Sequence, residues 1–255
     1  MNGVNRKLKP VFIFFFAAIF IAGGLAGFFL NPVITQNAGP VLSPDECYHA
    51  AVVDAMDAES SEIMPLVDIT PESDMVSWND AGDKILLLTW HKHPESYAVG
   101  KETALEWGEV WTFTDKEIVK WYGENKNGVT DWELRLKQLI GLPPDSGYTH
   151  VSALWVDPDD IIRPAYATDI TEDAMMTSLP EGTDEAYAEW FDGNIISSYY
   201  EGAYPWTRLG YTYDWLADDR EYGLSEFIVK QGSVVDVDFT LTTEEFINWL
   251  DERDL

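Results

Sequence analysis

An uninterrupted apolar run near the N-terminus constrains this chain more than any other feature of its sequence. Residues 11–30 read VFIFFFAAIFIAGGLAGFFL and carry no charged side chain. A helix of this length rises about 30 Å, which matches the hydrocarbon core of a bilayer. We therefore expect residues 11–30 to form a transmembrane signal-anchor helix, with a separate domain beyond it.

Charges around the apolar run indicate its orientation. Arg6, Lys7 and Lys9 precede the run, and the next Lys or Arg is Lys84. Because positive residues stay on the cytoplasmic side, residues 1–10 are expected in the cytoplasm and the rest outside, as a single-pass protein of the cell membrane. The alternative is a cleaved signal peptide and a secreted product. Against it, the run is longer than usual for a signal peptide and no good small-residue cleavage site follows.

Composition limits the partners of the outer part. The chain has 45 acidic and 16 basic residues, a formal net charge of −29 at pH 7. A field of this sign repels phosphate backbones, so nucleic acid is excluded as a partner. Cys47 is the only cysteine, so no internal disulfide can form, and packing or bound ions must stabilise the domain.

Capping boxes, in which Ser or Thr is followed three residues later by Glu, predict the starts of four helices. These boxes begin at Ser43, Thr114, Thr130 and Thr242. Another helix is expected from Asp184, with Thr183 as its N-cap. The helices are short, and the apolar residues in them form stripes that suit a protein core.

Strand patterns lie between these helices. Residues 85–90 (ILLLTW) are apolar on both faces, which is typical of a central strand covered on both sides. Residues 109–114 and 148–156 alternate, and residues 226–230 and 233–241 flank a Gln-Gly turn as a hairpin.

The order of these elements predicts the fold class and the domain organisation. Helices and strands do not alternate regularly, which favours an α+β fold. We expect an N-terminal transmembrane helix, a linker over 31–42, and one globular extracytoplasmic domain over 43–255 with a mostly antiparallel sheet and several short capped helices.

Three histidines suggest a metal site. If the central strand continues to residue 93, His91 and His93 share a face, and His150 on the strand over 148–156 could complete a zinc site with an open position for water. Such a site would make the protein a zinc-dependent hydrolase or hydratase. Hydrogen-bonded histidines at a strand end are the alternative.

Two groups of acids could hold calcium through oxygen ligands. They are Asp157, Asp159 and Asp160, and later Asp218, Asp219 and Glu221. Asp157 also fits the N-cap of a short turn with proline in its first position. No cofactor is predicted from these patterns, and zinc and calcium are the ions such groups would accept.

An aromatic stretch over 204–215, YPWTRLGYTYDW, is the predicted contact surface for an extracellular or envelope protein or a glycan. The alternative is an irregular loop that packs its rings into the core. The candidate binding residues are Tyr204, Trp206, Arg208, Tyr211, Tyr213, Asp214, Trp215 and Glu226.

Two resemblances accompany these patterns. The segments RLKQLIGLPP, WVDPDDIIRP, YPWTRLGYTYDW and GLSEFIVKQGSVV resemble an uncharacterised group of bacterial, mostly exported proteins with no assigned activity, over about residues 85–240. The segment EFIVKQGSVV is similar to the closing hairpin of ADP-ribosyltransferase-like folds, where a Glu at a strand start contacts the nicotinamide ribose. That second resemblance implies such a role for Glu226, with Arg208 as a second participant in transfer chemistry.

The absence of other motifs narrows the function. The sequence contains no G-x-S-x-G, phosphate-binding glycine loop, H-E-x-x-H or C-x-x-C. We therefore expect a membrane-anchored binding module, with the zinc enzyme as the alternative and an ADP-ribosyltransferase-like fold as a third reading.

Overall fold

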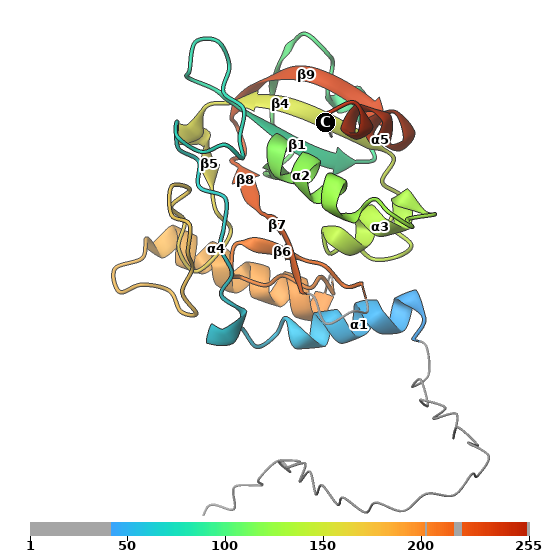
Figure 1. Ribbon diagram of the computed structural model, residues 1–255. Coiled ribbons are helices and arrows are strands. Elements are labelled where there is room, and N and C mark those ends of the chain that lie inside the picture. Colours follow the sequence, from blue (N-terminus) through green and yellow to red (C-terminus); the bar gives the residue numbers. More distant parts are fainter. Residues whose placement is uncertain (1–41, 202, 217–220, 254–255) are drawn as a thin grey trace, which may run out of the picture. The chain divides into compact units, whose positions relative to one another are not determined.

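The computed structural model describes residues 42–201, 203–216 and 221–253 (Figure 1). The chain divides into two units, 1–40 and 41–255, and the description below concerns the second. The expected transmembrane run over 11–30 lies outside the described residues, so the membrane location stays a prediction. Within the part of the chain that is described, none of the helices is long and apolar enough to cross a bilayer.

The domain is built on a curved antiparallel sheet of seven strands in the order β2-β9-β4-β1-β3-β8-β5 (Figure 1). The strands are β1 (Ile85–His91), β2 (Glu102–Ala104), β3 (Val110–Thr114), β4 (His150–Val156), β5 (Ile161–Ile162), β8 (Phe227–Val229) and β9 (Val234–Thr242). A separate hairpin pairs β6 (Tyr211–Tyr213) with β7 (Tyr222–Ser225). As predicted, β1 is a central strand, and all seven of its residues are buried.

The predicted fold class needs correction. An N-terminal transmembrane helix followed by an α+β domain with a mostly antiparallel sheet was expected. The α+β character and the antiparallel pairing are seen, but the sheet is a half-barrel with a few helices, and the described residues contain no membrane-spanning helix. The pairing of β4 with β9 shifts register between Ala153 and Leu154. Such an irregularity increases the twist and bends the strands, so it favours a curled sheet. Periodicity along the sequence reveals which side chains share a face, but it carries no information about curvature.

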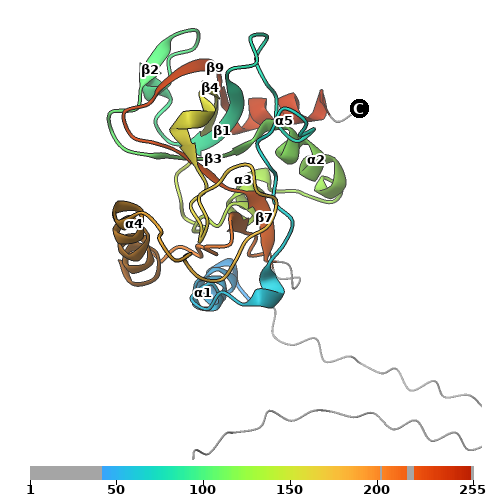
Figure 2. The ribbon, with the colours of Figure 1, turned by 90° about the vertical axis from the view of Figure 1, so that its left-hand side faces the viewer.

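The described residues contain five α-helices. They are α1 (Pro44–Asp54), α2 (Asp115–Asn125), α3 (Trp132–Leu139), α4 (Glu185–Ile196) and α5 (Thr243–Asp251). Shorter turns are η1 (Ser60–Glu62), η2 (Pro94–Ser96), η3 (Pro158–Asp160) and the single π-turn η4 (Ser197–Glu201). Helices α2, α3 and α5 pack against the sheet, while α1 and α4 lie near the β6–β7 hairpin (Figures 1 and 2).

Two of the predicted helix starts are confirmed by their capping hydrogen bonds, and the other three differ from the prediction. Ser43 and Thr242 form complete capping boxes at α1 and α5. Helices α3 and α4 begin one residue later than expected, because the carboxylates of Asp131 and Asp184 cap them. Thr114 makes no capping hydrogen bond at α2, and the Glu117 carboxylate, expected to accept from the Thr114 N–H, instead accepts hydrogen bonds from Ser225.

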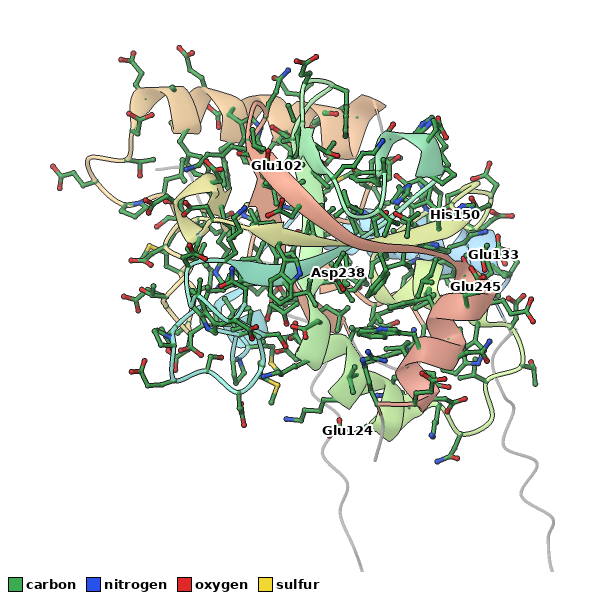
Figure 3. The ribbon with its side chains drawn as sticks, turned by 90° about the horizontal axis from the view of Figure 1, so that it is seen from above. Glu102, Glu124, Glu133, His150, Asp238 and Glu245 are labelled. Carbon is green, nitrogen blue, oxygen red and sulfur yellow. The ribbon has the colours of Figure 1, made fainter. Side chains whose placement is uncertain are left out.

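Exposed acids are spread over the domain. Figure 3 labels five carboxylates that are all exposed and that come from β2, α2, α3, β9 and α5, namely Glu102, Glu124, Glu133, Asp238 and Glu245. Charges distributed in this way keep a domain soluble and attract cations from all sides.

Candidate functional site

The aromatic stretch over 204–215 is packed into the domain. Six of the candidate residues there, Trp206, Arg208, Tyr211, Tyr213, Asp214 and Trp215, are between 1% and 9% exposed, whereas Tyr204 is 42% exposed. These six side chains therefore do not form the exposed contact surface that the sequence suggested, and the alternative of a loop that packs into the core describes them. A count of aromatic residues cannot separate the two cases, because rings are equally favourable in a core and at an interface.

The two charged residues of this stretch have structural partners. Arg208, at φ 60°, donates from Nη2 to the carbonyl oxygen of Ala55 at 2.9 Å, and its guanidinium lies 5.4 Å from the Tyr199 ring centre. Asp214 accepts two hydrogen bonds from Arg135, at 2.9 and 2.5 Å. Both arginines are buried, so these contacts hold α1 and α3 to the aromatic stretch.

Part of the stretch lines a cavity of about 480 Å³, which we call the aromatic pocket. Ten aromatic side chains contribute to its wall: Trp90, Tyr97, Trp107, Trp111, Phe113, Tyr148, Tyr204, Trp206, Tyr211 and Tyr213. The ionisable groups besides the tyrosines are His91, His93, Glu109 and Glu226. Among the described residues that line the pocket, none is Lys or Arg. The pocket thus joins two sets of candidates that the sequence suggested separately.

Glu226 is placed in the pocket by the junction of β7 and β8. Its backbone N–H donates to the carbonyl oxygen of Gly210 at 2.9 Å, and the next residue, Phe227, pairs with Thr112 of β3. Gly210 has φ +86°, and a Cβ there would lie 2.8 Å from Cδ of Arg163. Only glycine allows this close approach, which fixes the position of Glu226.

The carboxyl of Glu226 has an unusual environment. The side chain is half-buried, the residue lines the pocket, and no described residue donates a hydrogen bond to its carboxyl. Burial raises the pKa of Glu226 to about 8, because a charged carboxylate loses its hydration there and gains no partner. Glu226 is therefore mostly protonated at neutral pH when the pocket is free of ligand.

The polar tips of several pocket residues bond to groups outside it. Trp206 donates from Nε1 to the carbonyl oxygen of Pro164, Tyr211 donates its hydroxyl to the carbonyl oxygen of Glu62, and Tyr213 donates to Asp54. These rings consequently offer carbon surface to the pocket. Asn194, which also lines it, has a buried Nδ2 without a hydrogen-bond partner.

The structure does not bring the three candidate histidines together as a metal site. His91 and His150 are paired across β1 and β4, with ring centres 6.5 Å apart. His91 uses both ring nitrogens, Nε2 with Ser152 Oγ at 2.8 Å and Nδ1 as acceptor from the His93 N–H at 3.2 Å. Among the described residues, the three histidines do not form a group whose possible ligand atoms all lie within 4.8 Å of one another. Burial lowers the pKa of His91 to about 4, so this ring is neutral near pH 7.

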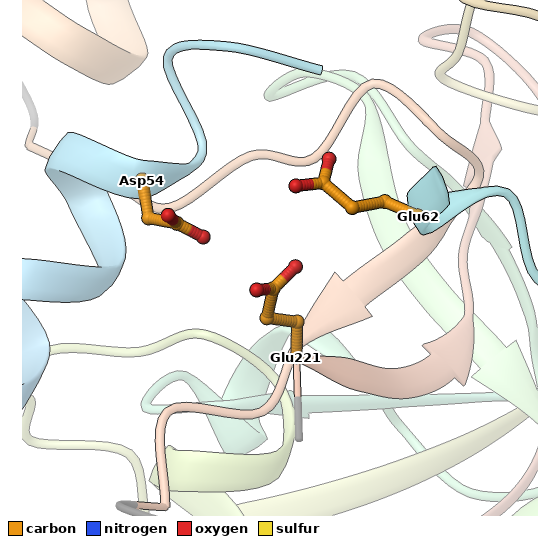
Figure 4. Close-up of side chains that lie close together, drawn as sticks. All are labelled: Asp54, Glu62 and Glu221. Carbon is orange, nitrogen blue, oxygen red and sulfur yellow. The ribbon is translucent and has the colours of Figure 1, made fainter. Parts of the chain in front are cut away.

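Three carboxylates do meet elsewhere. Asp54 at the end of α1, Glu62 in η1 and Glu221 before β7 point toward one another, with possible ligand atoms within 4.8 Å (Figure 4). Burial, and then repulsion by Asp54 and Glu62, raises the pKa of Glu221 to about 7. Oxygen ligands in such a group suit a hard cation such as calcium.

The other predicted acids have simpler roles. Asp157 caps η3 by accepting a hydrogen bond from the Asp159 N–H at 3.0 Å, which is the capping alternative. Asp218 and Asp219 lie outside the described residues, so only Glu221 of that predicted cluster can be placed.

Sequence reasoning missed several residues of the site. Trp107, Glu109 and Trp111 from one short segment and Asn194 from α4 line the aromatic pocket, and these two segments are far from each other in the chain. No local motif marks them, since a pocket wall is assembled by tertiary packing. The one available signal was the position of Glu109, which like Glu226 immediately precedes a strand.

Known proteins give no further guide to this site. Comparison of the chain with protein-family models, with curated protein sequences and with solved structures gave no match.

Proposed function

We propose that this domain is a binding module and that its ligand occupies the aromatic pocket. The supporting observation is the carboxyl of Glu226, which lines a ring-walled cavity without a hydrogen-bond partner among the described residues. An extracellular or envelope protein or a glycan, the expected partners, would present a projecting group to this pocket.

The wall of the pocket has the composition of a ligand site. Such sites are mostly apolar and carry a few polar groups that fix the orientation of the ligand. Here the rings of Trp111, Trp206 and Tyr211 supply apolar area, while Glu226 and Asn194 supply the polar groups. A volume of about 480 Å³ lies within the usual range for small-molecule pockets.

The unpartnered carboxyl also favours a functional role. A carboxyl that loses hydration and gains no partner has a perturbed pKa, and such groups cluster at functional sites. In the same wall the Nδ2 of Asn194 is buried without a partner, which costs about 1 to 3 kcal/mol unless a ligand pairs with it. By contrast, Glu117 is bonded to the backbone N–H and the hydroxyl of Ser225 at 2.9 and 3.0 Å, as expected of a structural acid.

A zinc-dependent hydrolase or hydratase is less well supported. That chemistry requires His91, His93 and His150 to share one ion, and His91 already uses both of its nitrogens in hydrogen bonds. The proposed binding of a ligand, in contrast, requires only that the aromatic pocket admit it.

A blocking substitution tests the proposal. Ser197 is exposed and lines the pocket, so Ser197→Trp should fill the cavity without removing a core side chain. The matched control is Ser178→Trp, at an exposed serine that does not line it. We expect at least one probe from a panel of glucose, N-acetylglucosamine, choline and 3,3-dimethylbutan-1-ol to raise the melting temperature of the full-length protein.

The same probe should leave Ser197→Trp unaffected and should stabilise Ser178→Trp as it does the wild type. Failure of every probe, or an equal response of Ser197→Trp and the wild type, would contradict the proposal. Trp fluorescence provides a second readout, because Trp111 and Trp206 line the cavity.

A further inference from the structure

The aromatic pocket is lined by acidic residues and by no lysine or arginine among the described residues. The acids are Glu109 and Glu226. Glu109 accepts a hydrogen bond from Trp190 Nε1 at 3.2 Å, so Glu226 is the acid left without a partner among the described residues. His91 provides no positive charge near neutral pH, since burial lowers its pKa to about 4. His93, the other lining histidine, has its Nδ1 3.4 Å from Glu95 Oε1, so a cation from outside would be the natural partner of Glu226.

The wall of the pocket contains two edge-to-face ring pairs. Trp111 and Trp206 stand at 86° with their centres 6.4 Å apart, and Tyr97 and Trp107 stand at 85° with 5.7 Å between centres. In each pair the edge of one ring meets the face of the other, so the ring that contributes its edge keeps its faces clear of that partner. Ring faces carry negative potential and attract ammonium groups, most strongly where water is excluded.

We infer that the aromatic pocket selects a small organic ammonium ion, whose positive charge pairs with the Glu226 carboxylate while its alkyl groups contact the rings. This inference rests on the proposed binding function and adds the chemical class of the ligand.

A neutral polyol fits the same wall less well. A sugar ring needs several hydrogen-bonding partners around it, but Trp206, Tyr211 and Tyr213 direct their N–H or O–H groups to other elements. Alkyl groups on nitrogen need no such partners and gain from contact with ring carbon.

The charge of the whole chain acts in the same direction. A formal net charge of −29 concentrates cations around the protein and raises their rate of association, with an effect that decreases as salt increases.

Binding of an ammonium ion should be coupled to release of a proton. In the free protein, burial raises the pKa of Glu226 to about 8, and a neighbouring cation would favour the ionised form. Below pH 8 the ligand must therefore displace a proton, so its affinity should fall about tenfold per pH unit.

The other ionisable groups that line the pocket are His91 at the end of β1, His93 just after it, Glu109 before β3, and five tyrosines. Burial raises the pKa of Tyr97, Tyr148, Tyr211 and Tyr213, so these phenols stay neutral between pH 6 and 9, and Tyr204 lies at the more exposed edge. The raised pKa of Glu226, about 8, lies inside this range.

Choline and its uncharged isostere 3,3-dimethylbutan-1-ol provide the test, because they differ in charge and hardly in shape. Calorimetric titration of the full-length protein, in buffers without amines, would be done at pH 6, 7.5 and 9. We expect choline to bind about 100-fold more tightly than the isostere at pH 9 and to weaken about 100-fold at pH 6, following the tenfold change per unit below pH 8.

Two variants locate the effect. Glu226→Gln should reduce choline affinity to that of the isostere and abolish its pH dependence, whereas Glu102→Gln, at an exposed strand position, should behave as the wild type. Circular dichroism would confirm that both variants are folded.

The outcomes separate this inference from the proposed function. Equal affinity of choline and the isostere at pH 9, or choline binding that does not change with pH, would refute the inference that the ligand is an ammonium ion. The proposed binding function would still stand if Ser197→Trp blocked the binding of any probe. Absence of binding by every probe would overturn both.

Discussion

Replacement of Glu226 by glutamine should stabilise the folded domain, and the gain should increase with pH. Burial raises the pKa of this carboxyl from 4.5 to about 8. Between these two values the unfolded chain has lost a proton that the folded chain retains, so the wild type loses stability as the pH rises. The stability linked to this group is fully present below pH 4.5 and is lost as the pH passes through about 8.

The magnitude follows from the pKa difference. Each pH unit within this window changes the free energy of unfolding by about 1.36 kcal/mol, which gives about 3 kcal/mol at pH 7 and about 5 kcal/mol at pH 9. Glutamine has no such ionisation, so Glu226→Gln should exceed the wild type by these amounts and by less than about 1 kcal/mol at pH 5.

Urea unfolding at pH 5, 7 and 9 would measure the difference. Glu102→Gln is the matched control, because it makes the same chemical change at an exposed position of β2, and it should shift stability little at any pH. A difference between Glu226→Gln and the wild type that is independent of pH, or a less stable variant at pH 9, would refute the reasoning.

Three further predictions concern packing and charge. Trp206→Ala should lower the free energy of unfolding by about 3 to 5 kcal/mol, because this 5% exposed ring packs in the core; a loss below 1 kcal/mol in urea unfolding would contradict that burial. Arg135→Met should lower the free energy of unfolding by about 3 to 5 kcal/mol, because the buried Asp214 carboxylate loses the guanidinium that pairs with it. The double variant Arg135→Met, Asp214→Leu should recover most of this loss in the same urea assay. Glu221→Gln should stabilise the domain at pH 8 and not at pH 4, because the raised pKa of about 7 makes the wild type lose stability as the pH rises from 4.5 to 7. Solvent screening limits this gain in the free energy of unfolding to about 1 kcal/mol, and thermal unfolding at both pH values would measure it.

Local patterns predicted the elements that depend on neighbours in sequence. Helices α1 and α5 begin at their capping boxes because Ser43 and Thr242 find their partners three residues away. The β1 strand was recognisable because six consecutive apolar or weakly polar residues suit burial on both faces.

Features set by distant contacts could not be predicted in this way. Glu117 leaves the capping position of α2 to bond with Ser225, which is 108 residues further along the chain. Arg208 takes a left-handed backbone conformation to reach Ala55, although nothing in the sequence around it signals that partner. Curvature of the sheet likewise depends on the register shift between β4 and β9.

The candidate site contains residues that local patterns could reveal and residues that only distant contacts bring together. Glu226 could be singled out as a glutamate at the start of a strand, and the aromatic stretch could be recognised as unusual. Exposure of that stretch could not be inferred, because burial of Trp206 and Tyr211 depends on packing partners elsewhere in the chain, such as Leu66 and Phe191. Glu109 and Asn194 reach the same pocket from two further segments.

The ionisation of Glu226 in the presence and absence of ligand tests the account most directly. Carbon-13 NMR of the side-chain carboxyl, assigned with Glu226→Gln, should give a pKa of about 8 in the free protein. Saturating choline should lower it by at least about two units, because a cation beside the carboxylate favours the charged form and a 100-fold change in affinity corresponds to a shift of that size. A pKa near 4.5 in the free protein, or a raised value that choline leaves unchanged, would contradict the account.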